Sequence, residues 1–180
     1  MDVNYSKERS MSERVREAYG TAHEVLSSLC AVNALAMRAA HVMGYNGFKR
    51  WHRYRAGEFL SLAMLLENEL FDRFGIVPKF EWNKVEYSPE SLKEHLRHWE
   101  SAALDGMKSL GEANRSLFGE TGMLSPVIEK ALKTLCKDRE RVARLRERFE
   151  ESEWLTFDVH RIDDKLHKKF KKKEKRDGRR

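Results

Sequence analysis

The chain has 180 residues, of which 41% are hydrophobic and 36% are charged, and its formal net charge is +6. This length suits one domain with a buried core, and the presence of only three prolines favours a mainly helical, folded protein over a disordered one. No apolar run approaches the roughly 20 residues of a membrane span, and the polar first residues carry no secretion signal, so the sequence predicts a cytoplasmic protein without membrane partners.

The first predicted helix covers residues 12–43. Its apolar residues recur at spacings of three and four from Val15 to Met43, which indicates one buried face. The Gly-Tyr-Asn-Gly sequence at residues 44–47 predicts a tight turn, so the next helix should fold back antiparallel on the first.

The second predicted helix runs from about residue 47 to residue 74, with apolar residues such as Phe48, Trp51 and Leu62 at helical spacing. Its centre, Phe-Leu-Ser-Leu-Ala-Met-Leu-Leu at residues 59–66, is apolar nearly all round. One partner helix cannot bury such a surface. We therefore expect it to meet another helix pair, another subunit, or both.

A long connection follows the second helix. Ser88-Pro89 predicts the next helix start, because a serine oxygen caps free N–H groups and proline loses nothing at the first helical position. The connection is then about 14 residues long, whereas helices of a bundle are usually joined by about 2–8. Extended at about 3.3 Å per residue, it reaches about 46 Å, which matches the roughly 42 Å length of the second helix. A third helix can therefore start at the far end and run parallel to the second.

The third predicted helix runs from Pro89 to about residue 118, and Ser125-Pro126 repeats the capped start for a fourth. A short fifth segment at residues 153–170 has looser helical spacing. The three connections within the four-helix unit are thus short, long and short. One long crossover is typical of ferritin-like bundles, and an ordinary four-helix bundle with one long loop is the alternative.

The residues themselves resemble one family. MGYNGFKRWHRYRAGEF followed by FGIVPKFEW is similar to the end of the first helix, the second helix and the crossover entry of non-haem ferritins. The Gly-Phe-x-x-Trp start and the distance from Glu58 to Pro78 fit best, and the resemblance extends weakly over residues 12–170. Ferritins, bacterioferritins and the DNA-protecting Dps proteins share this bundle. The resemblance implies an all-α ferritin-like four-helix bundle with a short C-terminal helix, assembled into a homo-oligomeric cage.

Ferritins oxidise Fe(II) at a di-iron site inside each bundle, where carboxylates are hard ligands and a Glu-x-x-His pair places two ligands on one helix face. The resemblance implies one metal ligand on each helix. These are Glu24, Glu58, Glu100 and Asp138.

The second-helix part of this motif is degenerate. Where the family has Glu-Glu-x-x-His, this chain has Glu58, Phe59 and Leu62, so the bridging carboxylate and the histidine are missing. Facing carboxylates repel unless a metal or a basic side chain neutralises them, and Arg55, three residues before Glu58, could do so. His95 and His98, on the charged third helix, are expected to face solvent rather than bind metal. A dismantled or weakened centre and a residual iron site on the remaining acids both stay open.

The positive charge is concentrated at one end. Residues 165–180 contain ten Lys and Arg against two Asp and Glu, a net charge of +8, so residues 1–164 carry −2. We therefore divide the chain into a ferritin-like bundle with a short fifth helix at 1–164 and a basic, disordered tail at 165–180. Lys-rich ends of Dps-like proteins resemble DNA-binding arms, which neutralise phosphates without sequence specificity; a solvated end that keeps an assembly soluble is the other interpretation. The residues predicted to contact nucleic acid are Lys168, Lys169, Lys171, Lys172, Lys173, Lys175 and Arg176.

These patterns predict a ferritin-like iron-binding or iron-storage protein with a weakened or lost ferroxidase centre and iron as its candidate cofactor. Whether it is an enzyme, a ferroxidase, depends on whether the remaining carboxylates hold metal. The alternative is a Dps-like or structural ferritin-like protein that binds DNA through its basic tail.

Overall fold

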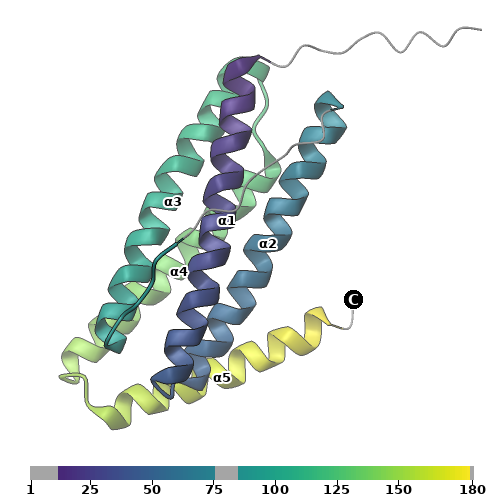
Figure 1. Cartoon of the computed structure of the whole chain (residues 1–180). Coiled ribbons are helices and arrows are strands. Elements are labelled where there is room, and N and C mark those ends of the chain that lie inside the picture. Colours follow the sequence, from purple (N-terminus) through teal and green to yellow (C-terminus); the bar gives the residue numbers. More distant parts are fainter. Residues whose placement is uncertain (1–11, 76–84, 179–180) are drawn as a thin grey trace, which may run out of the picture.

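The computed structural model describes residues 12–75 and 85–178, and every regular element in these ranges is a helix. The helices are α1 (Glu13–Val42), α2 (Asn46–Phe74), α3 (Leu92–Thr121), α4 (Pro126–Glu151) and α5 (Thr156–Asp177). Figure 1 shows α1 and α2 antiparallel, α3 parallel to α2, and α4 antiparallel to α3. The predicted all-α four-helix bundle with one long connection between the second and third helices is confirmed.

The start of α3 differs from the predicted Pro89, because the helix begins at Leu92. Ser91 is the N-cap and accepts a hydrogen bond from the backbone N–H of Glu94 (3.2 Å). The Glu94 carboxylate in turn accepts the N–H of Glu90 at 2.7 Å. Two backbone donors are satisfied by this reciprocal arrangement, which is why it defines the helix start. The other predicted start is confirmed, since Ser125 caps α4 and proline occupies its first turn.

The apolar centre of α2 is divided between the core and the surface. Phe59, Leu62, Ala63 and Leu66 are at most 1% exposed and pack into the core. On the opposite side lies an exposed apolar strip of α2. It consists of Leu60, Met64, Leu65 and Phe71. The bundle of one subunit therefore buries only part of the apolar surface predicted from the sequence.

The C-terminal segment also differs from the prediction of a disordered tail, because α5 continues through the basic residues to Asp177. Ile162, Leu166 and Phe170 recur every four residues and are buried, with Phe170 fully so. This apolar stripe continues through the Lys-rich sequence and lets the helix pack on a neighbour despite its charge. The division of the chain at residue 164 stays a prediction.

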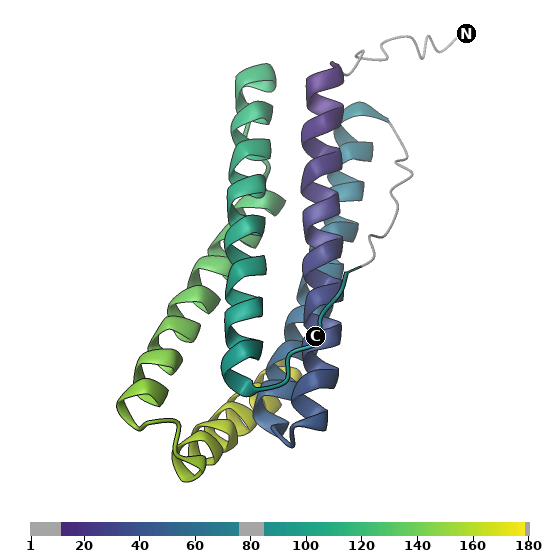
Figure 2. The ribbon, with the colours of Figure 1, turned by 60° about the vertical axis from the view of Figure 1, so that its left-hand side comes forward.

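Helix α5 lies across the end of the bundle where α2 begins (Figures 1 and 2). The side chain of Asp163 accepts a hydrogen bond from the backbone N–H of Phe48 (2.9 Å), so a residue of α5 caps α2. The N-cap residue of α2, Tyr45, makes no side-chain cap bond of its own. Farther along, Tyr54 donates to Asp177 at 2.9 Å. Residues of α5 thus complete the first turn of α2.

One helix, α1, contains an 18-residue window with a mean hydropathy of 1.4, enough by length and composition to cross a membrane. Core helices of globular proteins and N-terminal signal sequences pass the same test, so this is weak evidence for a span. Among the residues with described structure, no second helix passes it.

Candidate functional site

The core of the bundle holds an ion-pair network centred on Arg55 of α2. Its guanidinium binds both carboxylate oxygens of Asp138 on α4, with Nη2 donating to Oδ1 at 2.6 Å and Nε donating to Oδ2. Its Nη1 donates to Glu58, one turn farther along α2. Arg55 is 4% exposed and Asp138 is fully buried. This two-pronged geometry is the strongest form of arginine–carboxylate contact.

A second arginine completes the network from the α4 side. Arg141 donates from Nη1 to Asp138 Oδ1 at 2.5 Å. Burial alone would lower the pKa of Arg55, but the hydrogen bonds and charge of Asp138 outweigh it and raise that pKa above its ordinary value. Burial lowers the pKa of Arg141, against the attraction of Asp138. Two guanidinium groups thus share the buried carboxylate of Asp138.

The structure brings two of the four predicted ligands together. Glu58 and Asp138 meet through the guanidinium between them. Glu100 is half-buried and pairs with Arg146 of α4 at 2.5 Å. Glu24 lies on the exposed side of α1. As metal ligands, these four residues stay a prediction.

The residues around Arg55 do not fit a di-iron centre. A cation already bridges Glu58 and Asp138, so an iron ion would have to displace it. Phe59 and Leu62, the positions where the resemblance to ferritins implies a carboxylate and a histidine, are buried hydrocarbon side chains. Among the described residues, no group of three or more His, Cys, Asp or Glu side chains is placed to hold a metal ion.

A second buried polar cluster lies where α1, α2 and α3 meet. Asn33 of α1 donates its amide Nδ2 to the Leu29 carbonyl at 2.8 Å, which fixes its Oδ1 as an acceptor. That oxygen accepts Trp99 Nε1–H at 3.2 Å and lies 2.9 Å from His52 Nδ1. Since Oδ1 can only accept, His52 carries its proton on Nδ1.

The hydrogen bonds of His52 also determine which nitrogen of His95, on α3, carries the proton. With its proton on Nδ1, His52 has an acceptor at Nε2, which lies 2.9 Å from His95 Nε2. His95 must therefore donate from Nε2, leaving its Nδ1 as an acceptor 3.1 Å from the Tyr87 hydroxyl. Both imidazoles are neutral in this arrangement. Protonating His52 would set two N–H groups against each other unless His95 moved its proton to Nδ1, which faces the Tyr87 hydroxyl; that hydroxyl donates to the His95 carbonyl at 2.9 Å.

Sequence reasoning missed this cluster. The prediction that His95 faces solvent is wrong, because the side chain is fully buried. Its position three residues after Leu92 and four before Trp99 places it in phase with the buried face of α3, which is the signal that could have identified it.

The buried pair of His52 and His95 should make the folded protein less stable at acidic pH. Burial lowers the pKa of His95 to about 4, and burial together with the charge of His95 holds the pKa of His52 well below its ordinary 6.5. Because both folded-state values lie below the unfolded value, their stabilisation is complete above about pH 6.5 and is lost as pH falls towards 4. We expect the free energy of unfolding in urea to fall as the pH drops below 6.5, by at most about 1.4 kcal/mol per pH unit for His95, with a further loss in the same direction from His52.

Two variants separate this effect from general acid sensitivity. His95→Gln should reduce the pH slope by about half. His160→Gln, the same change at an exposed position of α5, should leave the slope as in the parent protein. Equal slopes in all three proteins would contradict the neutral pair.

Comparison with known proteins identifies the fold. No protein-family model and no curated protein matches the chain. Its structure is similar to that of an open-pore ferritin from the hyperthermophilic archaeon Archaeoglobus fulgidus, with a TM-score of 0.77, 16% identity, and coverage of 88% of this chain and 98% of that one. A closed form of that ferritin made by site-directed mutagenesis matches with the same TM-score and identity, over 88% and 97% of the two chains. The bundle is therefore ferritin-like, and at this identity the similarity establishes the fold alone.

Proposed function

We propose that this chain is a ferritin-like iron-storage subunit whose intrasubunit ferroxidase centre is lost. The observation that carries the proposal is the guanidinium of Arg55 between Glu58 and Asp138. An oxidation centre needs carboxylate oxygens free to bind Fe(II), whereas these oxygens are bound to a fixed cation that redox chemistry does not change. Iron is then cargo of an assembly, and no step of its oxidation runs through the bundle core.

The exposed apolar strip of α2 supports assembly into a homo-oligomer of the cage type. Its four large side chains, Leu60, Met64, Leu65 and Phe71, are 39–57% exposed. Contiguous apolar side chains of this size on a monomer mark an interaction surface. Packing against another copy would bury the part of α2 that the subunit's own core leaves exposed.

The first test is aerobic Fe(II) oxidation by metal-free protein, followed by absorbance against a buffer blank. We expect the initial rate to equal the blank, because Arg55 already binds Glu58 and Asp138, and Arg146 already binds Glu100. Iron content and particle size after expression in iron-rich medium should still show a large particle that retains iron.

If Fe(II) oxidation were instead faster than the blank, a matched pair of variants would show whether the predicted ligands are responsible. The proposal would be overturned by rapid oxidation of about one or two irons per subunit with a particular dependence on these variants. The oxidation would have to disappear in Glu24→Ala/Glu100→Ala and survive in the exposed control Glu17→Ala/Glu112→Ala. That result would establish a working centre on the predicted ligands.

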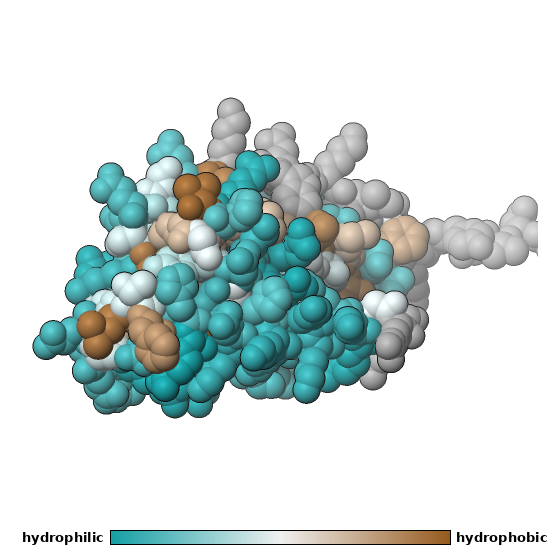
Figure 3. Space-filling view, turned by 90° about the horizontal axis from the view of Figure 1, so that it is seen from below, coloured by the Kyte–Doolittle hydropathy of each residue, from teal (hydrophilic) through white to brown (hydrophobic). Residues whose placement is uncertain are grey.

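The nucleic-acid alternative is favoured by one observation, the exposed cations of α5. Lys168, Lys171, Lys172 and Lys175 are exposed, and the end of the molecule where α5 lies has a mostly hydrophilic surface (Figure 3). Deleting residues 165–180 would also remove the buried Phe170, so the sharper test substitutes exposed lysines. Under this alternative, Lys171→Gln/Lys172→Gln/Lys175→Gln abolishes a DNA mobility shift that the parent protein produces, with a steep dependence on salt.

A further inference from the structure

A pocket of about 290 Å³ lies between the C-terminal half of α4 and the middle of α5. In Figure 2 this half of α4 diverges from the other long helices, and α5 turns back beneath the bundle. Three aliphatic side chains, Leu145, Ile162 and Leu166, form the apolar part of its lining. The polar part is entirely basic. It consists of Arg141, Arg144, Arg148, Lys165 and Lys169.

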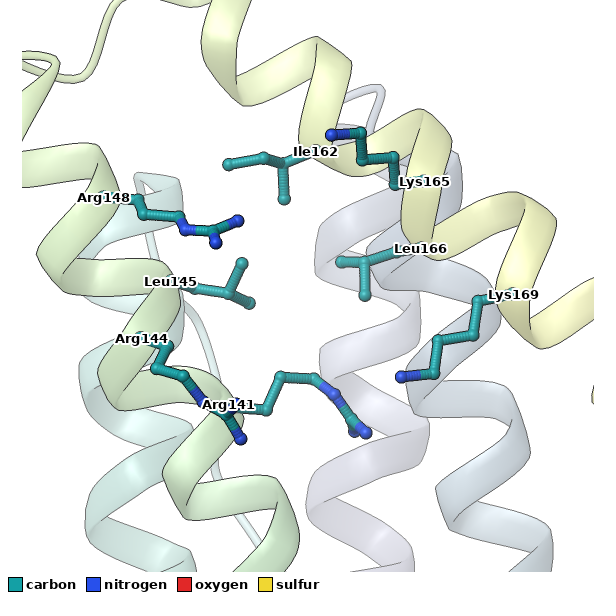
Figure 4. A pocket seen from close by; sticks show the side chains of 8 residues that line it. All are labelled: Arg141, Arg144, Leu145, Arg148, Ile162, Lys165, Leu166 and Lys169. Atoms are coloured by element: carbon teal, nitrogen blue, oxygen red, sulfur yellow. The ribbon is translucent and has the colours of Figure 1, made fainter.

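Helical spacing explains why these cations converge. Arg141, Arg144 and Arg148 are separated by three and four residues and share one face of α4, and Lys165 and Lys169 do the same on α5. Figure 4 shows the side chains of Arg141 and Arg148 extending from α4 towards α5, while Lys169 extends back towards Arg141. The two basic faces are therefore turned towards one space.

Carboxylates balance only part of this charge. Arg141 binds Asp138 at 2.5 Å and Arg144 lies 3.6 Å from Glu140. Arg148, Lys165 and Lys169 form no ion pair with any residue in the described parts of the chain. The positive charge of Arg141, followed by burial, lowers the pKa of Lys169. A bound anion would relieve that repulsion.

We propose that this pocket binds the diphosphate group of a small molecule, either free pyrophosphate or a nucleoside diphosphate. Arginine guanidinium groups match phosphate oxygens in a two-pronged geometry, and several cations around one space suit a compact ligand of high charge. The volume lies near the lower end of small-molecule sites, which are about 300–1,000 Å³. The aliphatic side chains offer a contact for an organic group attached to the phosphates.

These features favour a compact anion over nucleic acid. A strand presents single charges spaced along its length and is matched by an extended basic surface. Here the charges face one another across a pocket with an apolar lining. The proposal is independent of the iron chemistry, because it uses side chains outside the Arg55 site except for Arg141, which contacts both.

The test is calorimetric titration of the full-length protein with inorganic pyrophosphate and, separately, with ADP at constant ionic strength. We expect saturable binding of one ligand per chain. Arg148→Gln/Lys165→Gln should raise the Kd at least tenfold. The control Lys133→Gln/Lys137→Gln makes the same change in net charge at exposed positions of α4 outside the pocket, and should change the Kd less than twofold.

The two probes distinguish the source of the phosphate. Tighter binding of ADP would assign the pocket to a nucleotide or similar organic ligand, and tighter binding of pyrophosphate would assign it to the free anion; both outcomes support the site. Equal weakening by the two variants, no saturable binding of either probe, or binding of single-stranded DNA alone would overturn it.

The melting temperature shows whether Arg148→Gln/Lys165→Gln is still folded. Without ligand, Arg148→Gln/Lys165→Gln should melt no lower than the parent protein, because it relieves repulsion between like charges. Pyrophosphate should raise the melting temperature of the parent protein and of the control variant but not that of the pocket variant.

Discussion

Arg55→Met should reduce the free energy of unfolding by about 3 kcal/mol at pH 7, because it leaves the buried carboxylate of Asp138 with one of its two arginine partners. Breaking a buried ion pair typically costs about 3–5 kcal/mol. The lower figure applies here because Arg141 keeps its bond to Asp138. Urea unfolding followed by circular dichroism measures the effect.

A double variant distinguishes the lost ion pair from lost packing. Arg55→Met/Asp138→Leu removes both charges and should recover part of the stability, since well-packed apolar residues can replace a buried pair without loss, although Arg141 then loses its bond to Asp138. Arg144→Met is the surface control. Its partner Glu140 is 69% exposed in its side chain, and loss of such a pair should cost less than about 0.5 kcal/mol. If all three proteins were equally stable, the network would contribute nothing to the fold.

Gly47→Ala should be at least as damaging, for a steric reason. A Cβ at this position would lie 1.9 Å from the backbone oxygen of Asp163 and 2.7 Å from its Oδ1. Helix α5 would have to move away, which also breaks the bond from the Phe48 N–H to Asp163. Overpacking costs about 1–3 kcal/mol and a hydrogen bond to a charged group contributes about 1.5–3 kcal/mol, so we expect a loss of about 3 kcal/mol or more.

The matched control lies on the same helix. A Cβ at Gly57 would have no heavy atom within 4 Å, so Gly57→Ala should stabilise the protein by about 0.5–1 kcal/mol through helix propensity. Urea unfolding measures both variants, and amide hydrogen exchange at Phe48 reports directly on the cap. An equal and favourable effect of both substitutions would mean that α5 does not pack against the start of α2.

The sequence was informative wherever structure depends on neighbours in the chain. Helical periodicity and the Ser125-Pro126 cap predicted the long helices, and the length of the second connection predicted their directions. The pairing of Arg55 with Glu58 was also accessible, because residues three apart share a helix face.

Contacts between residues far apart in the chain could not be predicted from the sequence in the same way. Asp138 is 83 residues from Arg55, and their pairing depends on the rotation and height of α4 relative to α2. The disordered tail was predicted because its charge outweighed a sparse signal. The buried apolar face of α5 consists of Val159, Ile162, Leu166 and Phe170, and their effect depends on a surface that α2 provides.

The cap that Asp163 provides for α2 also constrains the order in which the protein can be completed on the ribosome. The donor and acceptor are 115 positions apart in the chain. Synthesis proceeds from the N-terminus at about 5–20 residues per second. Helices α1 and α2, which form the first hairpin, are therefore made several seconds before Asp163, which caps α2. During that interval the first turn of α2 lacks this bond, which forms only when α5 has been made.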